Sequence, residues 1–167
     1  MLLNNLTNKI LKDNFGGALH SHYSSKLNKG IHDMPLILYP DYNFIFWDNQ
    51  LVESTDILSS DIEQYYYGDY NIGLKADLLR FKILEKFGGI YVDVDTEPLK
   101  RMPDDILSCN FFSGYQPNNE IAIGIMGSKP QEDLISFYIN SMLENIKKFT
   151  YDDKVSSEIW KITGPEF

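Results

Sequence analysis

The chain has 167 residues, of which 43% are hydrophobic and 14% aromatic, and this composition is that of a folded domain, not of a disordered chain. The formal net charge of −9 opposes nucleic acid or an anionic membrane surface as a partner. The single cysteine, Cys109, excludes an internal disulfide and a cysteine-based zinc cluster. This length fits one domain, and we expect one over residues 1–167.

The N-terminal region, residues 1–33, has weak signals. Leucine and isoleucine spacing predicts a short amphipathic helix over 2–12, and the polar, glycine-containing stretch 15–33 predicts a loop. A secretory signal and an apolar run long enough to span a membrane are both absent, so we expect no membrane span and a cytoplasmic location.

The middle of the chain predicts alternating strands and helices. The aromatic-rich segment 40–48 predicts a strand after a Pro-Asp turn, and cap signals in 54–67 predict a short helix. Residues 73–89 give the clearest helical pattern, which Gly88-Gly89 ends. The β-rich residues 90–95 then predict a strand that ends before Pro98.

The C-terminal part continues this alternation. Residues 110–116 and 120–128 predict two strands, and residues 130–149 predict a helix with a proline in its first turn. Helices that alternate with strands indicate an α/β domain whose sheet is mainly parallel and flanked by helices.

Four charged residues stand out in this pattern. Asp93 and Asp95 lie one residue apart near a predicted strand end, where carboxylates suit Mn²⁺ or Mg²⁺; a solvated acidic strand end is the alternative. Asp77 and Arg80 lie three residues apart inside an apolar helical stripe, so they share a face. They predict either an internal ion pair or the border of a polar cleft.

The stretch "ADLLRFKILEKFGGIYVDVDTEPLK" resembles the core of the glycosyltransferase family described as the sugar-binding region containing the DXD motif. That family includes the yeast-type initiating α-mannosyltransferases, and the large clostridial glucosylating toxins resemble it more distantly. The segments "YPDYNFIFWD", "NNEIAIGIMGSKP" and "TGP" extend the resemblance over residues 39–165. The residues in register are Asp77, Arg80, Gly88, Gly89, Tyr91, Asp93 and Asp95.

This resemblance implies a glycosyltransferase-A type fold and a metal-dependent, retaining transfer of a hexose. The implied donor is a UDP- or GDP-hexose, and the implied acceptor is a glycan or other hydroxyl compound, as in polysaccharide biosynthesis. By resemblance, Asp93 contacts the ribose and the donor sugar, and Asp95, with Asp93, holds Mn²⁺ or Mg²⁺ and the diphosphate. Asp77 and Arg80 hold the donor sugar and act in catalysis with Asp93. Tyr91 and Asn119 complete the implied donor pocket.

Two departures from the family leave alternatives open. The family's opening strand is not recognisable here, and its segment after the "TGP" motif is missing, so we expect a domain truncated at both ends. Such a domain could act as a sugar-, nucleotide- or protein-binding module without activity. A second alternative is a haloacid-dehalogenase-type phosphatase, since "DVDT" fits its Asp-x-Asp-x-Thr motif, with Asp93 as nucleophile and Asp95 as acid/base.

Overall fold

The computed structural model describes residues 18–22, 42–96, 99–117, 120–149, 152 and 159–164. The predicted helix over 2–12 lies outside these residues. In chain order the elements are β1 (Ala18–His22), β2 (Asn43–Trp47), α3 (Asn49–Thr55), α4 (Ser60–Tyr67), α5 (Ile72–Phe87), β3 (Gly89–Val92), α6 (Asp104–Leu107), β4 (Phe111–Tyr115), β5 (Ile121–Ser128), α7 (Asp133–Ile146) and the 3₁₀ helix η3 (Ile159–Lys161).

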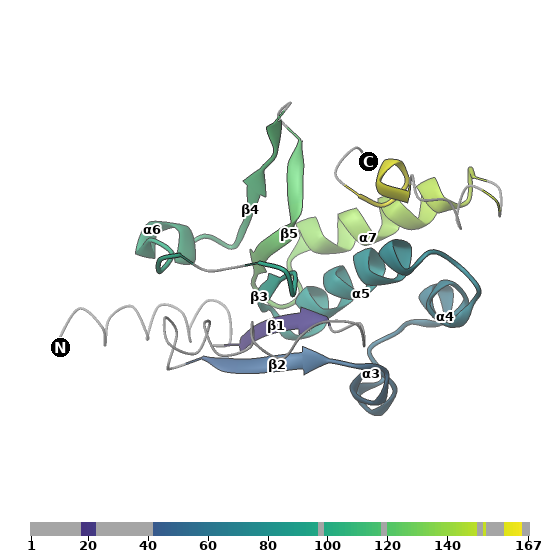
Figure 1. The fold of residues 1–167 in the computed structure, drawn as a ribbon, viewed down its shortest axis with the longest axis horizontal. Coiled ribbons are helices and arrows are strands. Elements are labelled where there is room, and N and C mark those ends of the chain that lie inside the picture. Colours follow the sequence, from purple (N-terminus) through teal and green to yellow (C-terminus); the bar gives the residue numbers. More distant parts are fainter. Residues whose placement is uncertain are drawn as a thin grey trace.

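The described strands form one mixed sheet in the order β2-β1-β3-β5-β4 (Figure 1). The pairs β1–β2 and β1–β3 are parallel, and the pairs β3–β5 and β4–β5 are antiparallel. The predicted α/β class is confirmed. The predicted parallel arrangement holds for β2, β1 and β3, while a direct hairpin connection makes β4 and β5 antiparallel.

The strand β1 corrects the prediction of a loop over 15–33. Its backbone pairs on both sides, with Leu19 opposite Phe44 in β2 and Ile90 in β3. The sequence "ALHSH" has few of the β-branched residues that mark a strand. Its partners on both sides therefore determine this strand more than its own composition does.

The helix α5 is the centre of the fold, and it matches the predicted helix 73–89 closely. It begins where the Asn71 side chain accepts a hydrogen bond from the Gly73 amide at 2.7 Å. It ends at Gly88, which has a φ of 64° and donates its N–H to the Leu84 carbonyl. The chain then turns directly into β3.

The apolar face of α5 lies in the main hydrophobic core. Leu74, Leu78, Leu79, Ile83 and Leu84 are each 0% exposed. In the same core α5 packs against α7, which the sequence predicts within 130–149, and Figure 1 shows the two helices side by side. The charged residues of α5 therefore lie on a helix that is well packed in the core.

Two local features complete the comparison with the predicted elements. The region predicted as one helix over 54–67 is instead the end of α3 and all of α4, separated at Asp56, which has a φ of 48°. The predicted strands 40–48, 110–116 and 120–128 are confirmed as β2, β4 and β5. Within the described part of the chain, no helix is both long and apolar enough to cross a membrane.

Candidate active site

Asp77 and Arg80 form a buried ion pair on α5. Arg80 Nη2 lies 3.1 Å from Asp77 Oδ1, and the two residues are only 7% and 6% exposed. The other end of the guanidinium reaches away from the helix, because Arg80 Nη1 lies 3.2 Å from Asp93 Oδ1 and donates to the Ile123 carbonyl at 2.8 Å. Arg80 therefore joins α5, the turn after β3 and the strand β5.

Asp93 and Asp95 lie in a turn, which corrects the predicted strand 90–95. The strand β3 ends at Val92, and the Thr96 amide donates to the Asp93 carbonyl at 3.0 Å to close the turn. The alternation of side chains along a strand therefore does not govern this pair. Asp93 turns inward to Arg80 with its side chain 34% exposed, whereas Asp95 is exposed to solvent.

Tyr91 contacts both Arg80 and Asp93. Its ring is 1% exposed, and the Arg80 guanidinium carbon lies 5.0 Å from the ring centroid. This distance is within the range of a cation–π contact. Tyr91 also hydrogen-bonds the Asp93 side chain. The residues that line the adjoining cavity do not include Tyr91. Its contacts are therefore those of a residue that fixes Arg80 and Asp93.

Thr163 supplies the contact that sequence analysis missed. Its hydroxyl donates to Asp77 Oδ2 at 2.7 Å, and the residue is 1% exposed. The "TGP" motif carries no predicted role for Thr163, and only the fold brings this threonine to α5. Each carboxylate oxygen of Asp77 thus has its own donor, Arg80 on one side and Thr163 on the other.

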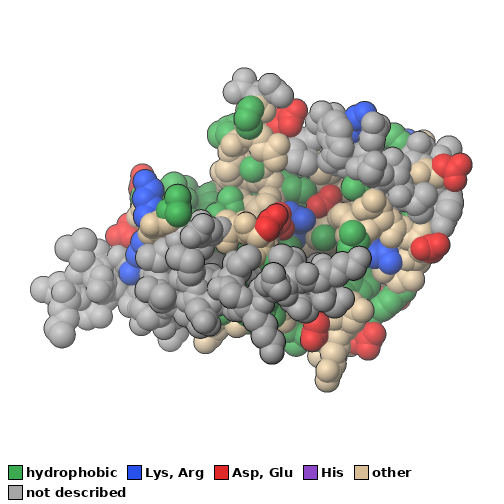
Figure 2. All heavy atoms as spheres, in the orientation of Figure 1, with side chains coloured by type: hydrophobic (Ala, Val, Ile, Leu, Met, Phe, Trp, Pro, Cys, Tyr) green, Lys and Arg blue, Asp and Glu red, His purple; other side chains and the backbone are tan. Residues whose placement is uncertain are grey.

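These residues border an open cavity of about 470 Å³. Figure 2 shows a hollow near the middle of one face, where acidic and basic side chains adjoin. The cavity draws on four separate parts of the chain. Its lining residues are Gly73, Asp77, Arg80, Asp93, Thr96, Gln116, Ala122, Ile123, Gly124, Ile125, Ile159 and Gly164.

Gly124 leaves the space that the Asp93 carboxylate occupies. A Cβ atom built on Gly124 would lie 2.7 Å from Asp93 Oδ2, closer than real Cβ contacts. The Gly124 carbonyl also accepts the Asp93 amide at 2.8 Å. The sequence analysis does not single out this glycine. The available signal is a glycine inside a predicted strand, after Ala122 and Ile123, where a close approach of another group is common.

The pKa values of the two carboxyl groups at the cavity, Asp77 and Asp93, are raised. Burial raises the pKa of Asp77 to about 6, although the Arg80 charge and the Thr163 hydrogen bond both act to lower it. Burial also raises the pKa of Asp93, where Arg80 opposes the shift and the neighbouring charge of Asp95 adds to it. The Asp93–Asp95 turn is therefore a place where an added cation would relieve both repulsion and desolvation.

Asp93 and Asp95 fit the predicted Mn²⁺ or Mg²⁺, because Asp93 lines the cavity with its side chain 34% exposed, Asp95 in the same turn is exposed to solvent, and their charges interact. Among the described residues there is no cluster of three or more His, Cys, Asp or Glu side chains that could hold a metal ion. Two carboxylates leave the rest of an octahedral shell to water and to phosphate oxygens. The donor set therefore suits a cation that arrives with a phosphate ligand.

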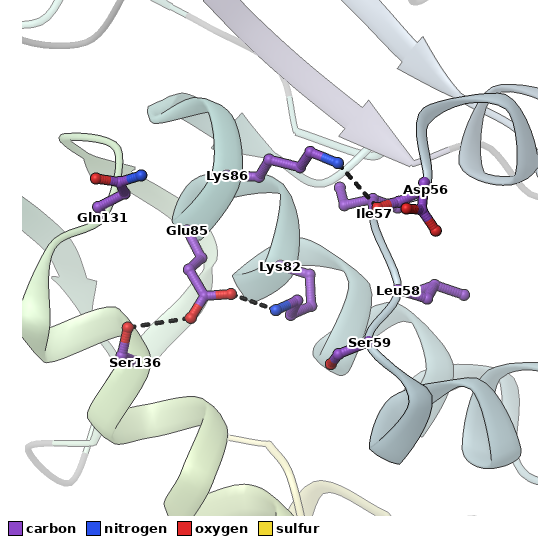
Figure 3. A pocket seen from close by; sticks show the side chains of 9 residues that line it. All are labelled: Asp56, Ile57, Leu58, Ser59, Lys82, Glu85, Lys86, Gln131 and Ser136. Atoms are coloured by element: carbon purple, nitrogen blue, oxygen red, sulfur yellow. Dashed lines mark hydrogen bonds and ion pairs between the residues drawn. The ribbon is translucent and has the colours of Figure 1, made fainter.

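A second cavity, of about 500 Å³, lies beside the C-terminal half of α5 (Figure 3). The side chains of Lys82, Glu85 and Lys86 each contact a partner nearby. Glu85 pairs with Lys82 and accepts from the Ser136 hydroxyl, and Lys86 donates to the Thr55 and Asp56 carbonyls. We refer to it as the outer cavity. Its lining residues are Asp56, Ile57, Leu58, Ser59, Lys82, Glu85, Lys86, Gln131 and Ser136.

The structure thus brings together four of the predicted site residues, Asp77, Arg80, Tyr91 and Asp93, and it places Asp95 in the adjoining turn. Asn119 lies outside the described residues. The roles predicted for these residues in binding and catalysis stay predictions.

Comparisons with known proteins point to one family. The family described as "Glycosyltransferase sugar-binding region containing DXD motif" matches residues 25–112. "Uncharacterized glycosyltransferase L373" of Acanthamoeba polyphaga mimivirus is 32% identical over 104 residues, which are 58% of this chain and 41% of that protein. "Mannosyl phosphorylinositol ceramide synthase CSH1" of Saccharomyces cerevisiae is 29% identical over 137 residues, which are 78% of this chain and 34% of that protein.

A solved structure agrees on the fold. The "PaToxG Glycosyltransferase" structure matches 99% of this chain and 73% of its own chain with a TM-score of 0.67, at 14% sequence identity. The chain itself spans less than half the length of the two curated relatives above. The matched family segment includes α5, β3 and the Asp93–Asp95 turn.

Proposed function

The chain belongs to the glycosyltransferase family with a sugar-binding region containing the DXD motif, and we propose that it moves a hexose from a nucleotide diphosphate sugar to a hydroxyl acceptor. The observation that carries this proposal is the line of charges Asp77–Arg80–Asp93 at the cavity. Asp77 and Arg80 are buried and Asp93 is partly buried, and carboxylates and a guanidinium held out of water at a cavity in this way are frequent at functional sites.

In this proposal Asp77 and Arg80 bind the hexosyl group. A buried carboxylate accepts hydrogen bonds from sugar hydroxyls, and a guanidinium donates to sugar or phosphate oxygens. The two residues border the cavity while their remaining contacts fix their position. Asp93 lies next to both the guanidinium and the exposed Asp95, so it would contact the ribose and the donor sugar together.

Asp95, with Asp93, would hold Mn²⁺ or Mg²⁺ at the mouth of the cavity. A divalent cation bound there would neutralise negative charge on the departing diphosphate. As the bond from the anomeric carbon to the diphosphate breaks, its electron pair would leave with the diphosphate; the acceptor oxygen would form the new bond to the anomeric carbon, and the acceptor's hydroxyl proton would pass to a diphosphate oxygen. In this proposal the carboxylates of Asp77 and Asp93 lie next to the donor sugar. Their negative charge would stabilise the positive charge that develops on the sugar ring.

We propose retention of the anomeric configuration, a proposal that rests on the resemblance to the family. The acceptor is a hydroxyl group of a glycan or of another compound. The yeast relative CSH1 is a mannosyl phosphorylinositol ceramide synthase by name, so acceptors in this family are not confined to polysaccharides. The phosphatase alternative loses its support, because Asp93 is paired with Arg80 and the chain belongs to the transferase family.

A nuclear magnetic resonance time course tests this proposal. The chain is incubated with Mn²⁺ and UDP-glucose, UDP-galactose, UDP-N-acetylglucosamine or GDP-mannose, and the first anomer released or transferred is identified. We expect turnover of at least one donor with the original configuration. First appearance of the inverted anomer would refute retention, and inertness with every donor would favour the binding-module alternative.

Titration of Mn²⁺ by electron paramagnetic resonance tests the metal separately. We expect weak binding to the chain alone and stronger binding with UDP or GDP, because two carboxylates supply only part of the coordination shell. Asp95→Ala should remove this binding without unfolding the chain, since Asp95 is exposed. Tight binding without any nucleotide would contradict the proposed use of phosphate ligands.

A further inference from the structure

The segment 159–164 closes one side of the cavity and is fixed to two helices. Ile159 and Ile162 are 7% and 2% exposed, and both belong to the main core. A Cβ atom on Gly73 at the start of α5 would lie 2.9 Å from Ile159 Cγ2, so the contact is close. In α7, the Asn145 side chain donates to the Ile162 carbonyl at 2.9 Å. These contacts with α5 and α7 therefore fix the position of Thr163.

Thr163 makes a polar contact that links this segment to the charged line at the cavity. Its hydroxyl donates to Asp77 Oδ2, while Asp77 Oδ1 meets Arg80 Nη2. Two donors on opposite oxygens fix the rotation of the carboxylate about its Cβ–Cγ bond. Without the hydroxyl, the carboxylate could turn and Arg80 would lose the geometry of its contact with Asp77.

We propose that Thr163 is a positioning residue for the hexosyl group of the donor. This inference rests on the proposed function. Thr163 orients Asp77, and Asp77 in turn holds the Arg80 guanidinium between itself and Asp93. The effect is expected mainly on the sugar part of the donor, because Thr163 contacts Asp77, which is assigned to the sugar hydroxyls, whereas Asp95 is assigned to the metal and the diphosphate.

Three variants separate positioning from packing. Thr163→Val removes the hydroxyl and keeps the shape, Thr163→Ser keeps the hydroxyl, and Ile162→Val trims a buried neighbour whose side chain belongs to the core. For each variant, isothermal titration with Mn²⁺ measures binding of the four nucleotide sugars and of UDP and GDP alone. A second measurement, which needs no ligand, follows the Arg80 Nε–H resonance by nuclear magnetic resonance.

We expect Thr163→Val to weaken nucleotide-sugar binding by roughly tenfold and to leave UDP or GDP binding within about twofold, because a hydrogen bond to a charged group is lost only on the sugar side. The Arg80 resonance should shift in Thr163→Val, and Thr163→Ser and Ile162→Val should resemble the parent. If Thr163→Val does not fold, Thr163→Cys replaces it, since a thiol is a weak donor.

Equal weakening of sugar and diphosphate binding in Thr163→Val, an equal loss in Ile162→Val, or no change in any measurement would overturn the inference. If the parent chain binds none of the donors and neither diphosphate, the proposed function fails. The orienting role of Thr163 is then decided by the Arg80 resonance alone. A shift in Thr163→Val that Thr163→Ser does not show supports that role, and an unchanged resonance refutes it.

Discussion

Two cavities of nearly equal volume lie along the same helix, one of about 470 Å³ at Asp77 and Arg80 and one of about 500 Å³ at Lys82 and Glu85. In the outer cavity, a charged pair is formed within one turn of α5, and the remaining lysine binds carbonyls at the end of α3. In the other, a buried arginine joins carboxylates from two segments, and Thr163 of a third segment donates a hydrogen bond to one of these carboxylates.

The difference teaches that volume alone does not identify the site. The ion pair of the outer cavity needs only helical spacing, which any surface helix supplies. The charges at the Asp77 cavity are largely removed from water, and that costs free energy unless each charge meets its partner in good geometry. The following substitutions test this contrast.

The largest effect is expected for Arg80→Lys. An ammonium group cannot reproduce the contacts of the two guanidinium ends with Asp77 and Asp93. Donor turnover should fall by about 100-fold or more, in keeping with the cost of breaking a buried pair. Lys82→Arg, on the same helix in the outer cavity, is the control and should retain the parent's turnover. If Arg80→Lys keeps most of the activity, Arg80 is only a structural partner of Asp77.

Asp77→Asn should change how stability depends on pH. The pKa of Asp77 is raised from 3.8 to about 6, so the folded state binds the proton more tightly than the unfolded state. The contribution of Asp77 to the free energy of unfolding is therefore largest below about pH 4. It falls by about 3 kcal/mol as the pH rises through about 6. The Asn side chain in Asp77→Asn does not titrate, so the free energy of unfolding of this variant should lack that fall. Urea unfolding of both proteins between about pH 4 and pH 7 measures the difference; a constant difference would contradict the shift.

Gly124→Ala should disturb Asp93 without removing any charge. The added methyl group would lie 2.7 Å from Asp93 Oδ2, so the carboxylate must move away from its present contact with Arg80. We expect donor turnover to fall by roughly tenfold, the scale of one misplaced charge-assisted hydrogen bond. Gly114→Ala in the facing strand is the control, because its Cβ would lie 3.4 Å from the nearest atom, the Ala122 Cβ. Equal activity in the two variants would show that Asp93 has room to move.

The smallest effect is expected for Glu85→Gln in the outer cavity. This change removes the charge that pairs with Lys82 and weakens the hydrogen bond from Ser136. A helical pair of this kind contributes about 0.5 kcal/mol, so the free energy of unfolding should change by no more than that. Donor turnover should be unchanged. A loss of turnover as large as that of Gly124→Ala would give the outer cavity a role that its local pairing does not indicate.

Much of the helical and polar framework was predictable from sequence, because its signals are local. Helical periodicity and Gly88 define α5, and the spacing of Asp77 and Arg80 on it predicts their shared face. For Asp77 and Arg80 two interpretations were open, an internal ion pair or the border of a polar cleft, and the structure combines them.

The remaining features depend on contacts distant in sequence. The strand β1 lacks a strong strand composition and is defined by pairing with β2 and β3. The turn at Asp93 ends the strand earlier than the β-rich run suggested, because the Thr96 amide bonds back to Asp93. Thr163 was invisible as a site residue, since nothing local relates a threonine near the end of the chain to a carboxylate on α5.

The hydrogen bond between Thr163 and Asp77 joins residues 86 positions apart, and this has a consequence for biosynthesis. Contacts between distant residues form late, because the intervening chain must first be ordered. On the ribosome, α5, the sheet and α7 all emerge before residue 163 is available. A nascent chain at that stage has Asp77 and Arg80 in place on their helix, but the carboxylate lacks its second donor. The cavity therefore reaches its final form only after the segment 159–164 has left the exit tunnel.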